Sequence, residues 1–199
     1  MPTNRDETED PQHWRVRNRE QVLNGDPWLR VWREDLTLPD GREVEAFFKI
    51  EMPDYVVIVA TTVDDQILTL RGYKHGPRRI CTSLPAGFIE RGEDPLDAAR
   101  RELLEETGHV ADTWEPLGHF VNDGNRGGGS GHLYLARAAR PAAEPNSGDL
   151  ETVTIELISL EDLVQSTATG AIGDIPNAAA IGLAAVRLCC AATAKSIEK

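Results

Sequence analysis

One short segment constrains this chain more than any other, because it has the pattern of a helix with two well-marked ends. Residues 95–107 read PLDAARRELLEET, with alanine and leucine on one side and charged residues on the other. Asp94 can cap the first turn, Pro95 suits the first helical position, and Gly108 suits the position just past the end. The segment therefore predicts a helix over residues 95–107.

The same segment carries three acidic side chains close together. Glu102, Glu105 and Glu106 stand at positions i, i+3 and i+4, so one helix turn presents all three on one face. Their mutual repulsion costs a few tenths of a kcal/mol per pair, roughly, and the negative end of the helix dipole adds to it. A divalent cation would reverse both effects, and carboxylate oxygens suit Mg²⁺ or Mn²⁺ rather than zinc. A solvated acidic face is the alternative interpretation.

The acids belong to a longer pattern, G-x₅-E-x₇-R-E-L-x-E-E-x-G, which runs from Gly87 through Glu93 and Arg101 to Gly108. It resembles the signature of the Nudix hydrolases at every charged and glycine position. The chain departs from it only at the hydrophobic position after Gly108, which is His109. The flanking sequences LPAGFIE, RGYKHG and PWLRVWREDLTLPDG resemble the ADP-ribose pyrophosphatase branch of that family, over about residues 14–190.

Hydrophobic periodicity and turn residues give the expected elements. The resemblance implies an α/β (α+β) fold, an α/β/α sandwich with a mixed β-sheet and an N-terminal antiparallel β region. We expect a disordered tail over 1–13, a β region for dimerisation and base binding over 14–52, and a hydrolase domain over 53–194. The predicted strands are 27–38, 44–50, 55–61, 66–70, 114–121, 132–138 and 152–158, and the other helices are 160–168 and about 176–194. The glycine-rich segment 123–131 and the polar segment 139–149 are expected to be loops.

The resemblance also implies roles for the residues of the pattern. Glu102, Glu106 and the main-chain carbonyl of Ala86 are expected metal ligands, and Glu105 is a further candidate. The remaining residues are expected to support the loop and the helix, by a salt bridge between Glu93 and Arg101 and by turn geometry at Gly87 and Gly108.

A general base is expected from a loop outside the helix. By resemblance, Asp149 and Glu151 are the candidates, and Glu151 is also a possible metal ligand. A solvated polar loop is the alternative. The branch usually has a proline where this chain has glycines, so Asp123 is another candidate for the base.

Two further groups are expected to contact the substrate. Five basic residues lie within nine positions, and Arg71, Lys74 and Arg78 among them are expected to bind phosphates, with surface solubility as the alternative; His75 and Arg79 complete the run. Lys74 stands where the branch usually has arginine, which is not an equivalent phosphate ligand. Trp28 and Trp32 alternate on a predicted strand. By resemblance Trp28 stacks on adenine across a homodimer; a core or interface role is the alternative.

The expected activity is Mg²⁺-dependent hydrolysis of a nucleoside diphosphate sugar, with Mn²⁺ as a possible substitute. The resemblance points first to ADP-ribose, which would give AMP and ribose 5-phosphate. GDP-mannose or another sugar nucleotide is the alternative substrate. A non-catalytic nucleotide-sugar sensor is a third hypothesis, disfavoured because the acids of the pattern are intact.

Charge and cysteine content limit the partners and the compartment. The 199-residue chain has a formal net charge of −12, which argues against a general nucleic-acid binder or docking on anionic lipid. The first 25 residues have no apolar run typical of a secretory signal. Cys81, Cys189 and Cys190 form an odd set without framework spacing, so we expect free thiols in the cytoplasm. The alanine-rich segment 177–194 is expected to be a packed helix.

Overall fold

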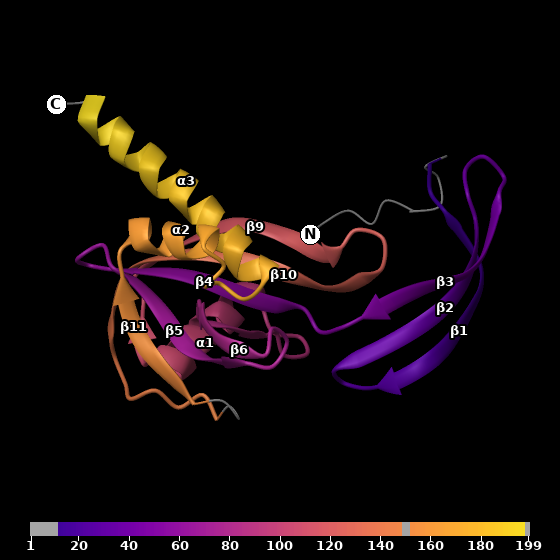
Figure 1. Cartoon of the computed structure of the whole chain (residues 1–199), viewed down its shortest axis with the longest axis horizontal. Coiled ribbons are helices and arrows are strands. Elements are labelled where there is room, and N and C mark those ends of the chain that lie inside the picture. Colours follow the sequence, from indigo (N-terminus) through magenta and orange to yellow (C-terminus); the bar gives the residue numbers. More distant parts are fainter. Residues whose placement is uncertain (1–11, 149–151, 198–199) are drawn as a thin grey trace. The chain divides into compact units, whose positions relative to one another are not determined.

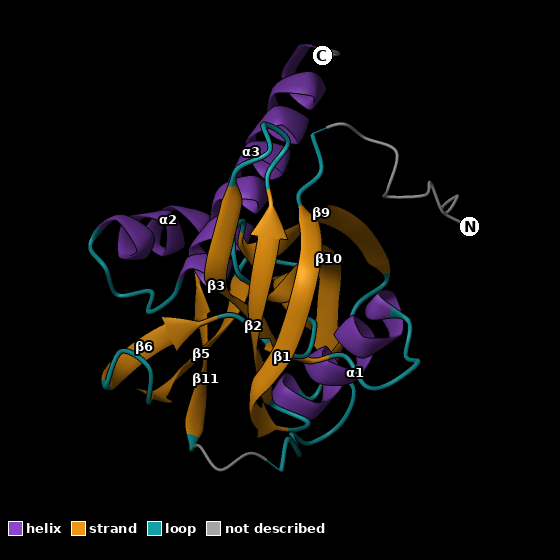
Figure 2. Cartoon of the chain, turned by 90° about the vertical axis from the view of Figure 1, so that its right-hand side faces the viewer, coloured by secondary structure: helices purple, strands orange, loops and turns teal. Residues whose placement is uncertain are grey.

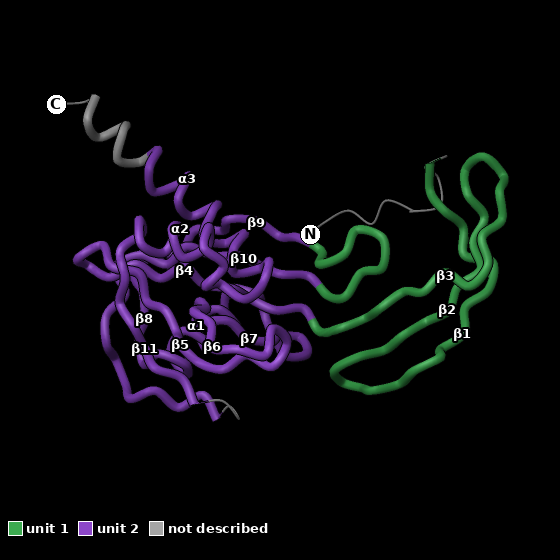
Figure 3. Tube along the Cα trace, in the orientation of Figure 1, with its two compact units in different colours: residues 1–53, 121–129 green, residues 54–120, 130–199 purple. Residues whose placement is uncertain are grey.

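The computed structural model describes residues 12–148 and 152–197, with side chains up to residue 190. The chain divides into two compact units (Figure 3). Unit 1 is residues 1–53 with 121–129, and unit 2 is residues 54–120 with 130–199. Most of the tail expected at 1–13 lies outside the described residues.

Unit 1 contains a three-stranded antiparallel arrangement of β1 (Arg15–Gly25), β2 (Leu29–Thr37) and β3 (Glu43–Glu51), which lie side by side in Figures 1 and 2. The turn predicted at residues 39–41 joins β2 to β3, with the Gly41 N–H donating to the Leu38 carbonyl at 2.9 Å. Strand β1 was not predicted. Its side chains are exposed along its whole length, so its sequence lacks the apolar alternation that marks a half-buried strand.

The prediction of a flexible loop over 123–131 is wrong. Strand β9 (Thr113–Asp123) runs to Asp123 and β10 (Gly127–Pro141) starts four residues later. The Asp123 carboxylate accepts hydrogen bonds from the N–H groups of Asn125 and Arg126 and holds this tight turn. Gly127 pairs with Ile50, and a Cβ there would lie 2.8 Å from the Ile50 carbonyl oxygen. Gly127 therefore permits close pairing of the β10 backbone with the β3 backbone.

The sheet of unit 2 is built on β4 (Tyr55–Thr62), which is buried on both faces and so has the continuous apolar sequence that was predicted. Strand β10 runs parallel to it, and the short β7 (Ala86–Phe88) runs antiparallel on the other side. Strand β5 (Ile67–Lys74) pairs with β6 (Arg79–Ser83) and β11 (Val153–Ile158), and β8 (His109–Val110) pairs with the end of β10.

Helices cover both faces of this sheet. Val56, Ile58 and Ala60 of β4 pack with α1 (Pro95–Thr107). The alternate residues Val57 and Val59 pack with α2 (Leu160–Ala168) and α3 (Ile175–Ile197). The α/β/α sandwich is therefore confirmed, with α1 on one side and α2 and α3 on the other (Figure 2). The polar segment 139–149 is only partly a loop, because β10 continues to Pro141.

The helix ends follow the predicted capping residues. The Asp94 carboxylate accepts the Leu96 N–H at 2.8 Å, and Gly108 ends α1 in the left-handed conformation with φ of 70°. Ser159 caps α2, as predicted. None of the described helices is long and apolar enough to cross a membrane. None of the three cysteines forms a disulfide in the described part of the chain, and Cys81 is buried.

Candidate active site

The position of α1 is set by its buried face. Ala98, Ala99 and Leu103 are fully buried against the sheet, which turns the side of the helix that carries Glu102 and Glu106 toward strand β7. Hydrophobic packing therefore determines which face of α1 contacts the sheet, and the helical spacing then determines where the acidic side chains lie.

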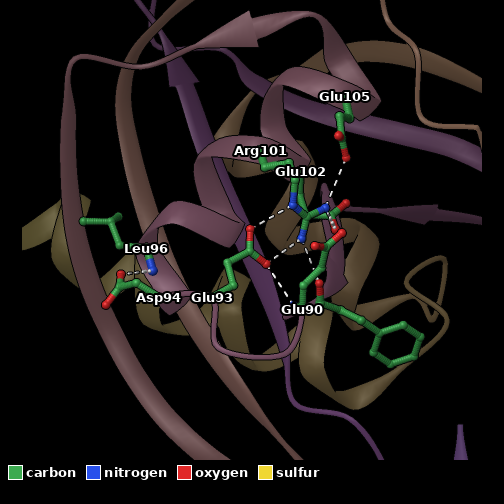
Figure 4. A network of polar contacts seen from close by, with 8 residues as sticks. Glu90, Glu93, Asp94, Leu96, Arg101, Glu102 and Glu105 are labelled. Carbon is green, nitrogen blue, oxygen red and sulfur yellow. Dashed lines mark hydrogen bonds and ion pairs between the residues drawn. The ribbon is translucent and has the colours of Figure 1, made fainter. Parts of the chain in front are cut away.

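Arg101 is the centre of a polar network on this helix (Figure 4). Its guanidinium donates from Nε and Nη2 to the two carboxylate oxygens of Glu93, at 2.9 and 3.0 Å. Nη1 donates to Glu102 at 2.6 Å and to Glu105 at 3.1 Å. Nη2 also donates to the Phe88 main-chain carbonyl at 2.9 Å. The predicted pair of Glu93 and Arg101 is thus part of a wider set of contacts, which ties β7 and the following loop to α1.

This network shifts the pKa values of the paired groups. The hydrogen bonds from Arg101 lower the pKa of Glu93, and the Glu90 N–H, which donates to Glu93 at 2.9 Å, acts in the same direction. The hydrogen bonds to Glu93 and Glu102 raise the pKa of Arg101 further above its usual value. Both groups therefore keep their charges at neutral pH.

Glu102 and Glu106 converge on the segment Ala86–Gly87. The Ala86 N–H donates to a Glu106 carboxylate oxygen at 2.8 Å. A Cβ at Gly87 would lie 2.1 Å from the Glu102 carboxyl carbon, so any larger residue there would displace this carboxylate. The expectation that Gly87 serves turn geometry is wrong, because Gly87 lies within β7 and pairs with Val56. Gly108 does serve a turn, because it ends α1 in the left-handed conformation.

The chemistry of these donors suits a hard divalent cation. Glu102 and Glu106 supply carboxylate oxygens beside the Ala86–Gly87 backbone, and the third expected ligand is a main-chain carbonyl. Among the described residues, no three His, Cys, Asp or Glu side chains already lie together in a metal-binding arrangement. Glu105, the further candidate ligand, contacts Arg101, and its side chain is 41% exposed.

The two candidate bases, Asp149 and Glu151, lie outside the described residues. Strand β11 starts with Val153, which pairs with Gly72 of β5. Asp123, the other candidate, holds the β9–β10 turn in unit 1, and the N–H group of Arg126 lowers its pKa.

The predicted phosphate-binding residues lie on the β5–β6 hairpin. Arg71 and Lys74 are on β5, with Arg71 exposed, and Arg78 is exposed in the turn. Arg79 instead donates to the Gly170 carbonyl at 2.6 Å, a contact that fastens the hairpin to the loop before α3. His75 packs beside Tyr73, with ring centroids 6.2 Å apart.

The expectation that Trp28 and Trp32 share one strand is wrong. Trp28 lies in the turn between β1 and β2, where its N–H donates to the Gly25 carbonyl, and its side chain is 60% exposed. Trp32 is on β2, and the Arg19 guanidinium carbon lies 3.9 Å from the centre of its ring. The register of β1 and β2 ends at the pair Gly25 and Leu29, which excludes Trp28 from the strand.

Sequence reasoning missed two contributors to the site. The Phe88 carbonyl receives Arg101, a main-chain contact that no residue type signals. Asn177, in the first turn of α3, accepts the Leu84 N–H at 2.6 Å. An asparagine at a helix start is a weak signal, and it does not identify a partner that lies 93 residues away in the sequence.

Comparison with known families agrees with this geometry. The model of the NUDIX domain family matches residues 51–176. The chain therefore belongs to the Nudix family and is a hydrolase of that family.

Several relatives and one solved structure give the comparison more detail. An ADP-ribose pyrophosphatase of Bacillus subtilis is 27% identical over 164 residues, which cover 82% of this chain and 88% of that protein. A methanol dehydrogenase activator of Bacillus methanolicus is 30% identical, covering 71% of this chain and 75% of that protein. A crystal structure of an ADP compounds hydrolase matches with a TM-score of 0.76 at 22% identity, covering 91% and 97% of the two chains. At that identity the structural match establishes the fold alone.

The network around Arg101 predicts a difference between two neighbouring arginines. Replacing Arg101 with methionine should lower the free energy of unfolding by roughly 1.5–3 kcal/mol at pH 7, because it removes charge-assisted hydrogen bonds from half-buried partners. Arg100 bonds only to exposed Asp97 among the described residues, so Arg100→Met should cost about 0.5 kcal/mol or less. Urea denaturation measures both values.

The same pair of variants has a defined pH dependence. The pKa of Glu93 is lowered in the folded state, so its contribution to stability is complete above its ordinary value of 4.5 and is lost as the pH falls. The gap between wild type and Arg101→Met should therefore narrow below about pH 4.5. Equal losses for the two arginine variants at pH 7 would contradict the network.

Proposed function

We propose that the protein hydrolyses the diphosphate bond of a nucleoside diphosphate sugar, and that ADP-ribose is the preferred substrate. The observation that carries the proposal is the convergence of Glu102 and Glu106 on the Ala86–Gly87 segment. Two curated relatives named as an ADP-ribose pyrophosphatase and an ADP-sugar pyrophosphatase, the latter from Mus musculus and 29% identical over 139 residues, support the substrate class.

Mg²⁺ is the proposed metal, with Mn²⁺ as a substitute. Glu102, Glu106 and the Ala86 carbonyl would hold it, with Glu105 or Glu151 as further ligands. When bound, such an ion neutralises phosphate charge and lowers the pKa of a water ligand. Gly87 leaves the space in which the Glu102 carboxylate lies, and the Ala86 N–H fixes the orientation of Glu106.

The proposed reaction is attack of water on one phosphorus of the diphosphate. The new P–O bond forms as the bond to the bridging oxygen breaks, and the products from ADP-ribose are AMP and ribose 5-phosphate. Glu151 or Asp149 is the proposed acceptor of the proton from water. Arg71, Lys74 and Arg78 are proposed to bind the substrate phosphates, since cations offset the charge that a protein of net charge −12 would otherwise repel.

The β1–β3 region is proposed to form a homodimer, in which Trp28 stacks on the adenine. Its sheet exposes apolar side chains that a second copy would cover, among them Leu23 at 46% and Phe48 at 47%. Three cysteines that form no disulfide support a cytoplasmic location. Sedimentation equilibrium at micromolar concentration should give twice the chain mass of 21.9 kDa, and a monomer would contradict the dimer.

Replacing Glu106 with glutamine should reduce kcat about 100-fold or more, because the change removes a ligand charge while keeping the side chain's size. Glu161→Gln, which changes an exposed acid on α2, is the matched control and should retain wild-type turnover. The assay measures AMP release from ADP-ribose with Mg²⁺ or Mn²⁺. Near-normal turnover in Glu106→Gln would refute the metal assignment.

The same assay separates the substrates. ADP-ribose, ADP-glucose, GDP-mannose and NADH are supplied one at a time, and kcat/KM for mononucleotide release should be highest for ADP-ribose. A higher value for GDP-mannose would favour the alternative sugar nucleotide, and release from none would favour the nucleotide-sugar sensor.

A further inference from the structure

A buried carboxamide joins α3 to the segment 84–87, which precedes α1 in the sequence. Asn177 is 6% exposed and lies in the first turn of α3. Its Oδ1 accepts the Leu84 N–H at 2.6 Å, and Leu84 is itself 2% exposed. Because Leu84 is buried, water cannot replace this acceptor, and the Leu84 N–H depends on Asn177 for its hydrogen bond.

The orientation of that carboxamide is set by a neighbouring carboxylate. Asn177 Nδ2 donates to both carboxylate oxygens of Asp174, each at 2.8 Å, and the Asn177 N–H donates to the same group at 2.9 Å. Asp174 thus acts as the N-cap of α3. Because the amide nitrogen is held by a carboxylate, which only accepts, the carbonyl oxygen must face Leu84.

Leu84 begins the segment on which the carboxylates of α1 converge, and that segment is held from three elements in turn. Asn177 of α3 accepts the Leu84 N–H, the Ile58 N–H of β4 donates to the Pro85 carbonyl at 2.9 Å, and Glu106 of α1 accepts the Ala86 N–H. Of these three bonds, only the bond from Asn177 comes from a helix on the face of the sheet opposite to α1.

We propose that Asn177, oriented by Asp174, is a positioning residue for hydrolysis: it fixes the segment 84–87 and thereby places the Ala86 carbonyl and the oxygen of Glu106 for the metal. The inference rests on the proposed function. Loss of the bond would leave a buried donor unpaired and let the segment shift, and displacements of about 1 Å at a reacting centre reduce rates by about 100-fold.

The first variant of the test removes the bond. Asn177→Leu should lower kcat by about 10- to 100-fold with KM changed less than about threefold. It should also weaken Mn²⁺ binding, measured without substrate, and speed hydrogen exchange of the Leu84 amide. These last two measurements report on the segment itself and do not depend on turnover.

The second variant rebuilds the bond by combining Asp174→Asn with Asn177→Asp, which exchanges the carboxylate and the carboxamide. The carboxylate introduced on α3 would accept the Leu84 N–H with one oxygen. With the other it would accept the amide group introduced at position 174. In this double variant kcat, Mn²⁺ affinity and Leu84 protection should therefore return toward the wild-type values.

Ile181→Ala is the matched control for loss of stability, because Ile181 is 1% exposed and lies one turn further along α3 on the buried face. It should lower the unfolding midpoint while kcat at 25 °C stays within about twofold of wild type. If Asn177→Leu does not fold, Asp174→Ala replaces it, with the same direction of change. Equal kcat losses in the Asn177 and Ile181 variants, or no recovery in the double variant, would overturn the proposal.

Failure of the proposed function has a different signature. If the wild-type protein releases no mononucleotide from any substrate of the panel, the proposed hydrolysis is refuted. Mn²⁺ affinity and Leu84 exchange then still decide whether Asn177 positions the segment: unchanged values in Asn177→Leu overturn the inference, and weaker binding with faster exchange supports it.

Discussion

The arrangement of the site depends on one guanidinium group. Arg101 carries a single positive charge among three carboxylates and one main-chain carbonyl, and it contacts all four. Since arginine presents its donors in a planar fork, these contacts fix angles as well as distances. Lysine has no such fork. The loop between β7 and α1 is therefore tied to the turn of the helix that carries Glu102 and Glu105.

This arrangement gives the acidity of the chain a physical meaning. The formal net charge of −12 includes the acids of α1, where Glu102 and Glu106 approach a backbone segment instead of pointing into solvent. Arg101 offsets part of that charge through its hydrogen bonds to Glu102 and Glu105. The proposed divalent cation would offset a further part of it and bring the site closer to neutral for an anionic diphosphate.

Much of the core and the placement of the α1 acids on one helix turn were predictable because local rules decide them. The caps of α1, the helical spacing of its acids and the apolar run of β4 each carry their structure in adjacent residues. The errors arise where the structure is determined by backbone groups that are distant in the sequence. Exposed β1 has no periodic signal, and Gly127 allows close pairing where flexibility was expected.

The same distinction holds within the site. The pairing of Glu93 and Arg101 follows from a motif, whereas the contact of Arg101 with the Phe88 carbonyl involves no particular residue type. The bond of Asn177 to Leu84 joins residues 93 apart, and only the fold brings them together. Trp28 illustrates the opposite error: alternation with Trp32 suggested one strand, but Trp28 belongs to the turn that follows Gly25.

We propose that the acids of α1 bind a divalent cation, and direct titration tests this binding without any substrate. Electron paramagnetic resonance of free Mn²⁺ gives the affinity of the wild-type protein and of Glu102→Gln. Glu115→Gln is the control, because this acid pairs with Arg137 and Arg187 elsewhere in unit 2. Glu102→Gln should weaken Mn²⁺ binding at least about tenfold, while Glu115→Gln should leave it unchanged. Equal affinities for all three proteins would contradict it.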